Sequence, residues 1–148
     1  MFRSILSGDN NFYLPLCINS NCNSRGIIYI IKCNLCSNVF YIGESGRTVN
    51  ERIYEHIKDI KNFKPYYKYK NVSFHFNLIG HDYRQHLSFY IFKNNCDDYY
   101  TRRYYETMLI YIFLNNNNYL LNDEKDCNFS FKRFYDLKFR SMFEFNDD

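Results

Sequence analysis

Residues 26–43 read GIIYIIKCNLCSNVFYIG, and this stretch sets the expected fold. Its two ends, 27–32 and 39–43, are rich in β-branched and aromatic side chains, which are enriched in strands. The polar residues between them predict a turn. The sequence therefore predicts an antiparallel hairpin, with Tyr29 on its first strand and Tyr41 on its second.

A helix is expected directly after the hairpin, from Thr48 to about Asn62. Thr48 and Glu51 have the spacing of a capping box, in which the hydroxyl and the carboxylate each accept a backbone N–H bond. The buried stripe of the helix is predicted at three isoleucines spaced four and three residues apart: Ile53, Ile57 and Ile60. Arg52 and His56 lie on a neighbouring face of this helix.

The remaining pattern predicts four more elements: a short helix at about Val72–Leu78, a strand at Leu87–Phe92, a helix from Asp97 or Asp98 to about Phe113, and a short extended piece at Tyr119–Asn122. The expected fold class is α/β of the α+β kind, with a small three-stranded antiparallel sheet flanked by helices. We expect one domain at 26–122, preceded by an irregular leader at 1–25. For the tail at 123–148 a packed strand, a packed helix and a linker remain open.

Composition bounds the function only loosely. The chain has 148 residues and a net charge of +3, which permits nucleic-acid binding without demanding it. Five lysines are interleaved with aromatic residues between Lys58 and Lys70, and they predict either a solvated surface or a segment that follows a DNA backbone. The 16 Tyr and 15 Phe reflect a general bias, so a single aromatic residue is a weak clue.

The location predicted from the sequence is intracellular. Neither a stretch of about 18 apolar residues nor a signal-peptide core is visible, so we expect no membrane association. Thiols stay reduced inside cells, and the six cysteines therefore need an explanation other than disulfides.

Four polar residues suit the hydrolysis of a phosphodiester: Tyr29, Tyr41, Arg52 and Glu106. A carboxylate can hold one Mg²⁺, which polarises the phosphoryl oxygen. A guanidinium stabilises the charge that develops in the transition state, and a phenol can orient or deprotonate a water molecule. Each residue taken alone also has an ordinary structural interpretation, in the core or at the surface.

The order and spacing of these residues resemble the GIY-YIG nuclease superfamily. The first half-motif corresponds to residues 26–29 and the second to residues 41–43, followed by a run to Arg52 and His56. Residues 103–106 resemble the segment with the metal-binding glutamate, and 120–122 resemble a terminal Gly-Leu-Asn signature with leucine in place of glycine. The resemblance covers about residues 26–122.

The resemblance implies a role for each site residue. Tyr29 would act as the general base or assist it, and Tyr41 would hold the water network. Arg52 would contact the scissile phosphate, and Glu106 would be the sole protein ligand of a catalytic Mg²⁺ or Mn²⁺. His56 would assist proton transfer or contact phosphate. Asn122 would support the site by hydrogen bonding, and Gly43 would allow close packing of the backbone.

The cysteines point to a second metal. Cys33 and Cys36 form a CxxC turn, and His75 and His81 follow downstream, which together make a four-ligand set suited to structural zinc. The alternatives are unrelated residues, or participation of a competing cysteine pair and a competing histidine: Cys17, Cys22 and His86. Two further cysteines are expected to be small buried hydrophobes: Cys96 and Cys127.

A CxxC between the half-motifs, followed by His-x5-His, resembles the endonuclease domain of Penelope-like retroelements. The sequence then predicts a metal-dependent DNA endonuclease of mobile-element type, which nicks DNA when monomeric and is nuclear if the element is eukaryotic. The oligomeric state stays open, as does the choice between a stand-alone gene, a fragment of an element and a captured gene. The alternatives are a zinc-stabilised DNA-binding module without catalysis and a protein-interaction module.

Overall fold

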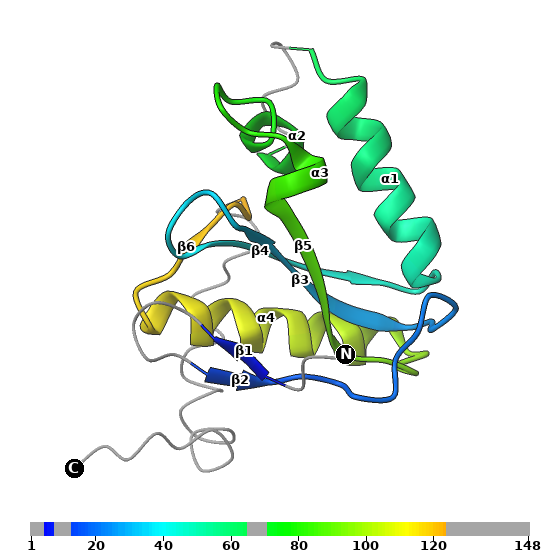
Figure 1. Ribbon diagram of the computed structural model, residues 1–148. Helices are drawn as coiled ribbons and strands as arrows, with labels where there is room; N and C mark the ends of the chain where they lie inside the picture. Colours follow the sequence, from blue (N-terminus) through cyan, green and yellow to red (C-terminus); the bar gives the residue numbers. More distant parts are fainter. Residues whose placement is uncertain (1–4, 8–12, 65–70, 124–148) are drawn as a thin grey trace, which may run out of the picture.

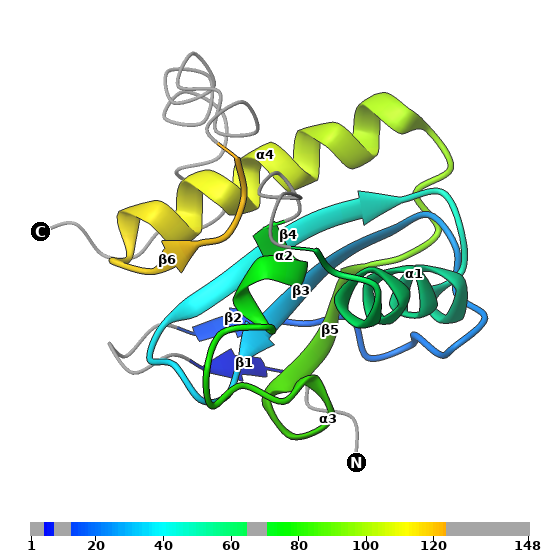
Figure 2. The same cartoon turned by 90° about the horizontal axis from the view of Figure 1, so that it is seen from above.

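The computed structural model describes residues 5–7, 13–64 and 71–123, which form an α+β fold around a four-stranded sheet (Figures 1 and 2). The expected hairpin is present as β3 (Ile27–Cys33) and β4 (Val39–Ser45), which pair antiparallel. β5 (Leu87–Lys93) pairs antiparallel with β3 on the other side. β6 (Tyr119–Leu120) completes the order β5-β3-β4-β6.

The prediction of a three-stranded antiparallel sheet is wrong, because the sheet is mixed. β6 lies parallel to β4, with Tyr119 opposite Val39 and Leu120 opposite Phe40. The helix between β5 and β6 runs along one face of the sheet and returns the chain to the start of β4 (Figure 2). A two-residue strand has no readable period, so its direction follows from this return path alone.

The two long helices begin at the capping residues that the sequence indicated. α1 (Val49–Lys61) has Thr48 as its N-cap, and both hydrogen bonds of the capping box are present. α4 (Tyr99–Asn115) begins at Asp98, whose side chain accepts from the backbone N–H of Thr101. The insertion between α1 and β5 holds α2 (Asn71–His75), which is shorter than expected, and α3 (Tyr83–His86), which was not predicted.

The leader at 1–25 is not wholly irregular, as had been expected. β1 (Ile5–Ser7) and β2 (Tyr13–Pro15) pair antiparallel, and the side chain of Leu14 is buried in the core of the domain. The backbone N–H of Cys17 donates to the carbonyl of Ile91 on β5 at 3.1 Å. Predictions for residues 65–70 and for the tail from 124 onward fall outside the described residues.

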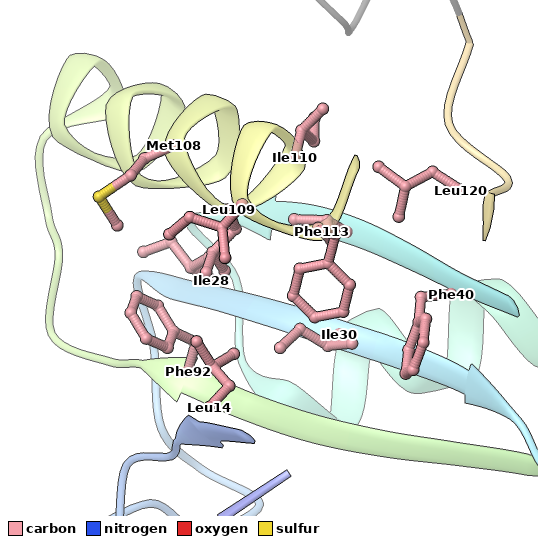
Figure 3. Close-up of a cluster of buried hydrophobic side chains, with 12 residues drawn as sticks. Leu14, Ile28, Ile30, Phe40, Phe92, Met108, Leu109, Ile110, Phe113 and Leu120 are labelled. Atoms are coloured by element: carbon pink, nitrogen blue, oxygen red, sulfur yellow. The ribbon is translucent and has the colours of Figure 1, made fainter. Parts of the chain in front are cut away.

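Two hydrophobic clusters lie on opposite faces of the sheet, because successive side chains of β3 alternate in direction. Ile28 and Ile30 point toward α4 and pack with Leu109 and Phe113 (Figure 3). The odd-numbered residues of β3 pack on the other face, with residues of α1 and α2. This alternation places Tyr29 on the face that α1 covers.

Candidate active site and candidate metal centre

Tyr29 lies directly above Gly43, its neighbour across the hairpin. Its side chain is fully buried, and a Cβ added to Gly43 would stand 2.4 Å from both Cζ and Oη of Tyr29. The ring stacks on Phe89 of β5, with 4.7 Å between the ring centroids. The absence of a side chain at residue 43 is therefore what lets the phenol extend across β4.

A hydrogen-bonded chain joins Tyr29 to two residues of α1. Nε of Arg52 donates to the phenol oxygen at 2.9 Å, and Nε2 of His56 lies 2.7 Å from the same oxygen. Arg52 and His56 are four residues apart, so both face the sheet from adjacent turns of the helix. Tyr41 lies beside them, with its ring centroid 5.7 Å from His56 and 6.3 Å from Tyr29.

The environment keeps the imidazole of His56 neutral near pH 7. Burial and, to a lesser extent, the positive charge of Arg52 lower the pKa of His56 to about 3, whereas Asp59 opposes the shift. Burial also raises the pKa of Tyr29 well above its ordinary value, and nearby Tyr41 and Glu106 add to this rise while Arg52 opposes it. The neutral imidazole can therefore accept the phenol hydrogen while Arg52 donates to the phenol oxygen.

Glu55 holds Arg52 from the solvent side. The Nη1 atom of Arg52 donates to Oε2 of Glu55 at 2.7 Å, and Arg47 makes an ion pair with the other carboxylate oxygen. Burial lowers the pKa of Arg52, but the neighbouring Tyr29 and Tyr41 raise it, and the net shift is upward. The guanidinium therefore stays charged next to the phenol.

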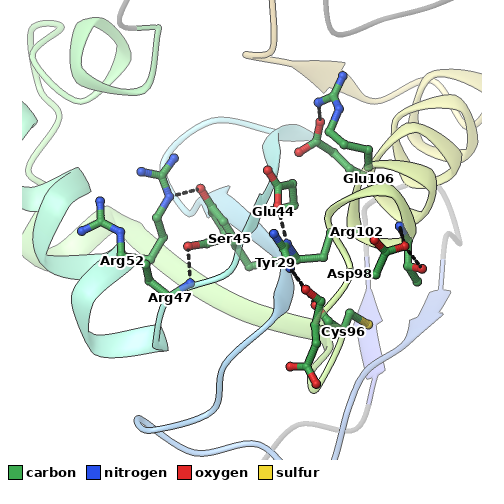
Figure 4. Close-up of polar contacts among 12 residues, drawn as sticks. Tyr29, Glu44, Ser45, Arg47, Arg52, Cys96, Asp98, Arg102 and Glu106 are labelled. Carbon is green, nitrogen blue, oxygen red and sulfur yellow. Dashed lines mark hydrogen bonds and ion pairs between the residues drawn. The ribbon is translucent and has the colours of Figure 1, made fainter.

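Glu106 lies on α4, which covers the face of the sheet opposite to α1. Its side chain is 7% exposed, and Arg103, one turn earlier on α4, donates to its Oε1 (Figure 4). Its charge raises the pKa of Tyr29, which places the carboxylate within electrostatic reach of the phenol. A single buried carboxylate is a hard oxygen donor of the kind that Mg²⁺ uses when it keeps most of its water ligands.

A buried ion pair connects β4 with the start of α4. Nε of Arg102 donates to Oε2 of Glu44 at 2.7 Å, and its Nη1 donates to the carbonyls of Cys96 and Asp97 at 2.9 Å each (Figure 4). Glu44 follows Gly43 on the strand and points toward α4 instead of α1. This contact fixes the position of the turn of α4 that precedes Glu106.

Asn122 closes the edge of the sheet beyond β6. Its side-chain amide accepts from the N–H of Ile42 at 3.0 Å and donates to the carbonyl of Ile42 at 2.7 Å. The amide thus pairs with β4 as a strand residue would, although β6 ends at Leu120. These bonds hold β4 at the residue that precedes Gly43, and the role expected of Asn122 in a catalytic site stays a prediction.

Tyr29, Arg52 and His56, which form the hydrogen-bonded chain, were all predicted from the sequence. Four charged residues around them were not predicted as partners: Glu44, Glu55, Arg102 and Arg103. The i, i+3 spacing from Arg52 to Glu55 and from Arg103 to Glu106 is a readable signal for two of these contacts. The pair of Glu44 and Arg102 has no local signal, because the two residues are 58 positions apart.

The four predicted zinc ligands form one cluster that could hold a metal ion such as zinc. Ligand atoms of Cys33, Cys36, His75 and His81 all lie within 4.8 Å of one another. Sγ of Cys36 is 3.3 Å from Nε2 of His81, and the two imidazole centroids are 4.6 Å apart. Nε2 of His75 is buried without a hydrogen-bond partner, as expected of a ligand atom whose partner is a metal.

Electrostatics around the cluster favour the neutral, ligand form of His75. Burial lowers the pKa of His75, and the neighbouring His81 adds to the shift, so the imidazole is neutral near pH 7. Burial raises the pKa of the Cys36 thiol, and a bound cation opposes such a shift by stabilising the thiolate. Two thiolates and two imidazoles are a donor set that zinc binds in a closed tetrahedral shell.

Of the competing ligands, His86 lies beside the cluster, with its ring centroid 6.2 Å from that of His81, but one of its ring nitrogens already has a partner. Nδ1 of His86 accepts the backbone N–H of Asp82 at 2.9 Å, which occupies that nitrogen. Sγ of Cys17 lies 3.5 Å from the Asn94 side chain, and Cys22 is exposed. The expectation that Cys96 is buried holds only in part, since its exposure is intermediate, and Cys127 falls outside the described residues.

Comparison of the chain with protein-family models, with curated proteins and with solved structures found no match. Among the residues that the structure describes, no helix combines the length and the apolar character needed to cross a membrane.

Proposed function

We propose that this chain is a metal-dependent DNA endonuclease of the GIY-YIG type that hydrolyses a phosphodiester bond. The supporting observation is the hydrogen-bonded chain from Arg52 through Tyr29 to His56, together with the buried carboxylate of Glu106 on α4, whose charge raises the pKa of Tyr29. A guanidinium, a phenol, an imidazole and a carboxylate, supplied by three separate elements, are the groups that hydrolysis of a phosphodiester needs.

In this proposal the protein's own groups bind the phosphate and orient the attacking water. Arg52 contacts a non-bridging oxygen of the phosphate and stabilises the charge that develops on it. Tyr29 orients the attacking water through its phenol oxygen, while its own hydrogen is donated to the neutral Nε2 of His56. Glu106 holds Mg²⁺ or Mn²⁺, which would polarise the phosphate and stabilise the leaving oxygen.

We further propose that zinc at Cys33, Cys36, His75 and His81 is structural. All four ligands come from the protein, which leaves no open position for a substrate. The site joins the β3–β4 turn to the insertion that carries α2 and α3. Because that turn connects Tyr29 to Tyr41, the metal would stabilise the hairpin on which both phenols are placed.

The test of catalysis is a plasmid nicking assay with Mg²⁺. We expect the wild type to convert supercoiled DNA to the open-circular form, and Glu106→Ala to lose cleavage while it still binds DNA in a gel-shift assay. Asp97→Ala is the matched control, since it removes an exposed carboxylate at the start of α4, and it should cleave normally. Undiminished cleavage by Glu106→Ala would refute this mechanism.

The metal cluster by itself also supports a second candidate, a zinc-stabilised DNA-binding module without catalytic activity. Such a module would bind DNA with a steep dependence on salt, because its lysines and arginines displace counterions. Folded, zinc-loaded protein that binds DNA but cleaves none with either Mg²⁺ or Mn²⁺ would favour this candidate.

A further inference from the structure

Arg103 differs from Arg52 and Arg102, the two arginines of the site that are most tightly held. The side chains of Arg102 and Arg52 are 11% and 25% exposed, and each is held by several partners. The side chain of Arg103 is 36% exposed and contacts the carboxylate of Glu106. It is therefore the arginine of this group that can leave its carboxylate with the least disruption of packing.

The contact has a consequence for the proposed metal site. Glu106 is 7% exposed, so its charge is poorly screened by water and requires a nearby cation. In the structure that cation is the guanidinium of Arg103. A divalent ion bound to the same carboxylate would stand close to the guanidinium, and two cations at such a distance repel each other.

A DNA phosphate offers Arg103 another partner. Guanidinium groups form strong, charge-assisted hydrogen bonds with phosphate oxygens. A phosphate next to the site would attract the exposed side chain away from Glu106 and leave the carboxylate free for the metal. Binding of DNA and binding of metal would then favour each other.

We propose that Arg103 suppresses metal binding at Glu106 until DNA supplies a phosphate for its guanidinium, so that metal and DNA bind cooperatively. This inference rests on the proposed function, because it takes Glu106 as the ligand of the catalytic metal. Arg103 acts in it through Glu106 and is a positioning residue.

The direct test measures Mn²⁺ affinity without DNA, using electron paramagnetic resonance to count free ions over zinc-loaded full-length protein. Arg103→Gln removes the competing charge and should bind Mn²⁺ about tenfold more tightly than wild type. Arg84→Gln removes an exposed arginine on α3 and controls for net charge, so its affinity should not change. If Arg103 only holds the carboxylate of Glu106 in place, Arg103→Gln should bind Mn²⁺ more weakly than wild type, which would overturn the inference.

A second measurement tests the cooperativity. The affinity for a fluorescent DNA duplex is measured with and without Ca²⁺, in buffer free of chelator so that zinc is retained. Wild type should bind DNA more tightly when Ca²⁺ is added. The ratio of the DNA affinity with Ca²⁺ to the affinity without it should be about tenfold smaller in Arg103→Gln than in wild type. An equal ratio in the two proteins would overturn the inference.

Glu106→Gln separates this inference from the proposed function. Loss of Mn²⁺ binding in Glu106→Gln, together with unchanged or weaker binding in Arg103→Gln, overturns the role of Arg103 and leaves Glu106 as the metal ligand. Normal Mn²⁺ binding in Glu106→Gln would show that Glu106 is not the metal ligand, and it would overturn both the proposed mechanism and this inference.

Discussion

Replacing Gly43 by alanine should destabilise the protein through a single contact. The new methyl carbon would stand 2.4 Å from Cζ and Oη of Tyr29, and ordinary carbon contacts are about 3.5–4.0 Å. The ring would have to move by about 1 Å. It is stacked on Phe89, and its oxygen is hydrogen-bonded to Arg52 and His56, so there is little freedom to do so.

The expected cost follows from these contacts. Overpacking of a filled core costs about 1–3 kcal/mol, and a weakened buried hydrogen bond adds about 1 kcal/mol. We expect Gly43→Ala to lower the free energy of unfolding by about 3 kcal/mol. At roughly 2–4 °C per kcal/mol for a chain of this size, Tm should fall by about 6–12 °C.

The assay is urea denaturation of four proteins that form a double-mutant cycle: wild type, Gly43→Ala, Tyr29→Leu and the double variant. Leucine at residue 29 lacks the atoms that clash with the methyl group. In that background Gly43→Ala should be neutral or should stabilise the strand by about 0.5–1 kcal/mol, since alanine is favoured over glycine there. An equal loss of stability in both backgrounds would refute the argument from the Tyr29 contact.

Three further predictions concern stability and metal content. His56 takes up a proton near pH 6.5 when the protein is unfolded but only at about pH 3 when it is folded, so its contribution to the free energy of unfolding is complete above pH 6.5 and is lost as the pH falls. From pH 6.5 to 5, wild type should lose about 2 kcal/mol more free energy of unfolding than His56→Gln in urea denaturation, and equal losses would contradict the pKa shift. Asn122→Leu leaves the backbone N–H and carbonyl of Ile42 without their side-chain partner and should lower the free energy of unfolding by about 2 kcal/mol, again measured by urea denaturation. An unchanged urea midpoint would show that these two hydrogen bonds contribute nothing to stability. Elemental analysis should find about one zinc per chain in wild type and none in a Cys33→Ser/Cys36→Ser variant, with a lower Tm when zinc is chelated; stably folded protein without metal would rule out a structural zinc site.

Local patterns account for most of the elements that were predicted. The β3–β4 hairpin follows from two β-branched runs around a polar turn, and α1 begins at the residue that its capping box marks. The hydrogen-bonding and steric preferences involved act within a few residues, so they can be read directly from the sequence.

Longer-range features could be predicted only in part. The metal cluster was predicted from a CxxC turn and two distant histidines, because zinc accepts few ligand types and their combination is distinctive. The extended piece at Tyr119–Asn122 was predicted, but its parallel pairing with β4 was not, because that pairing depends on the path of α4. The antiparallel pair of β1 and β2 was missed because its strands are short and polar residues surround them.

The sequence by itself determined which residues have the chemistry of a site, since phenols, guanidinium groups, thiols and carboxylates are properties of residue type. It also determined that Tyr29 and Tyr41 belong to one hairpin, because that pairing is local. Only the tertiary structure decided that Glu44 meets Arg102 and that Arg52 and His56 both meet the phenol oxygen of Tyr29. Those contacts join residues far apart in the chain, and they exist because both faces of the sheet must be covered by helices to bury its apolar side chains.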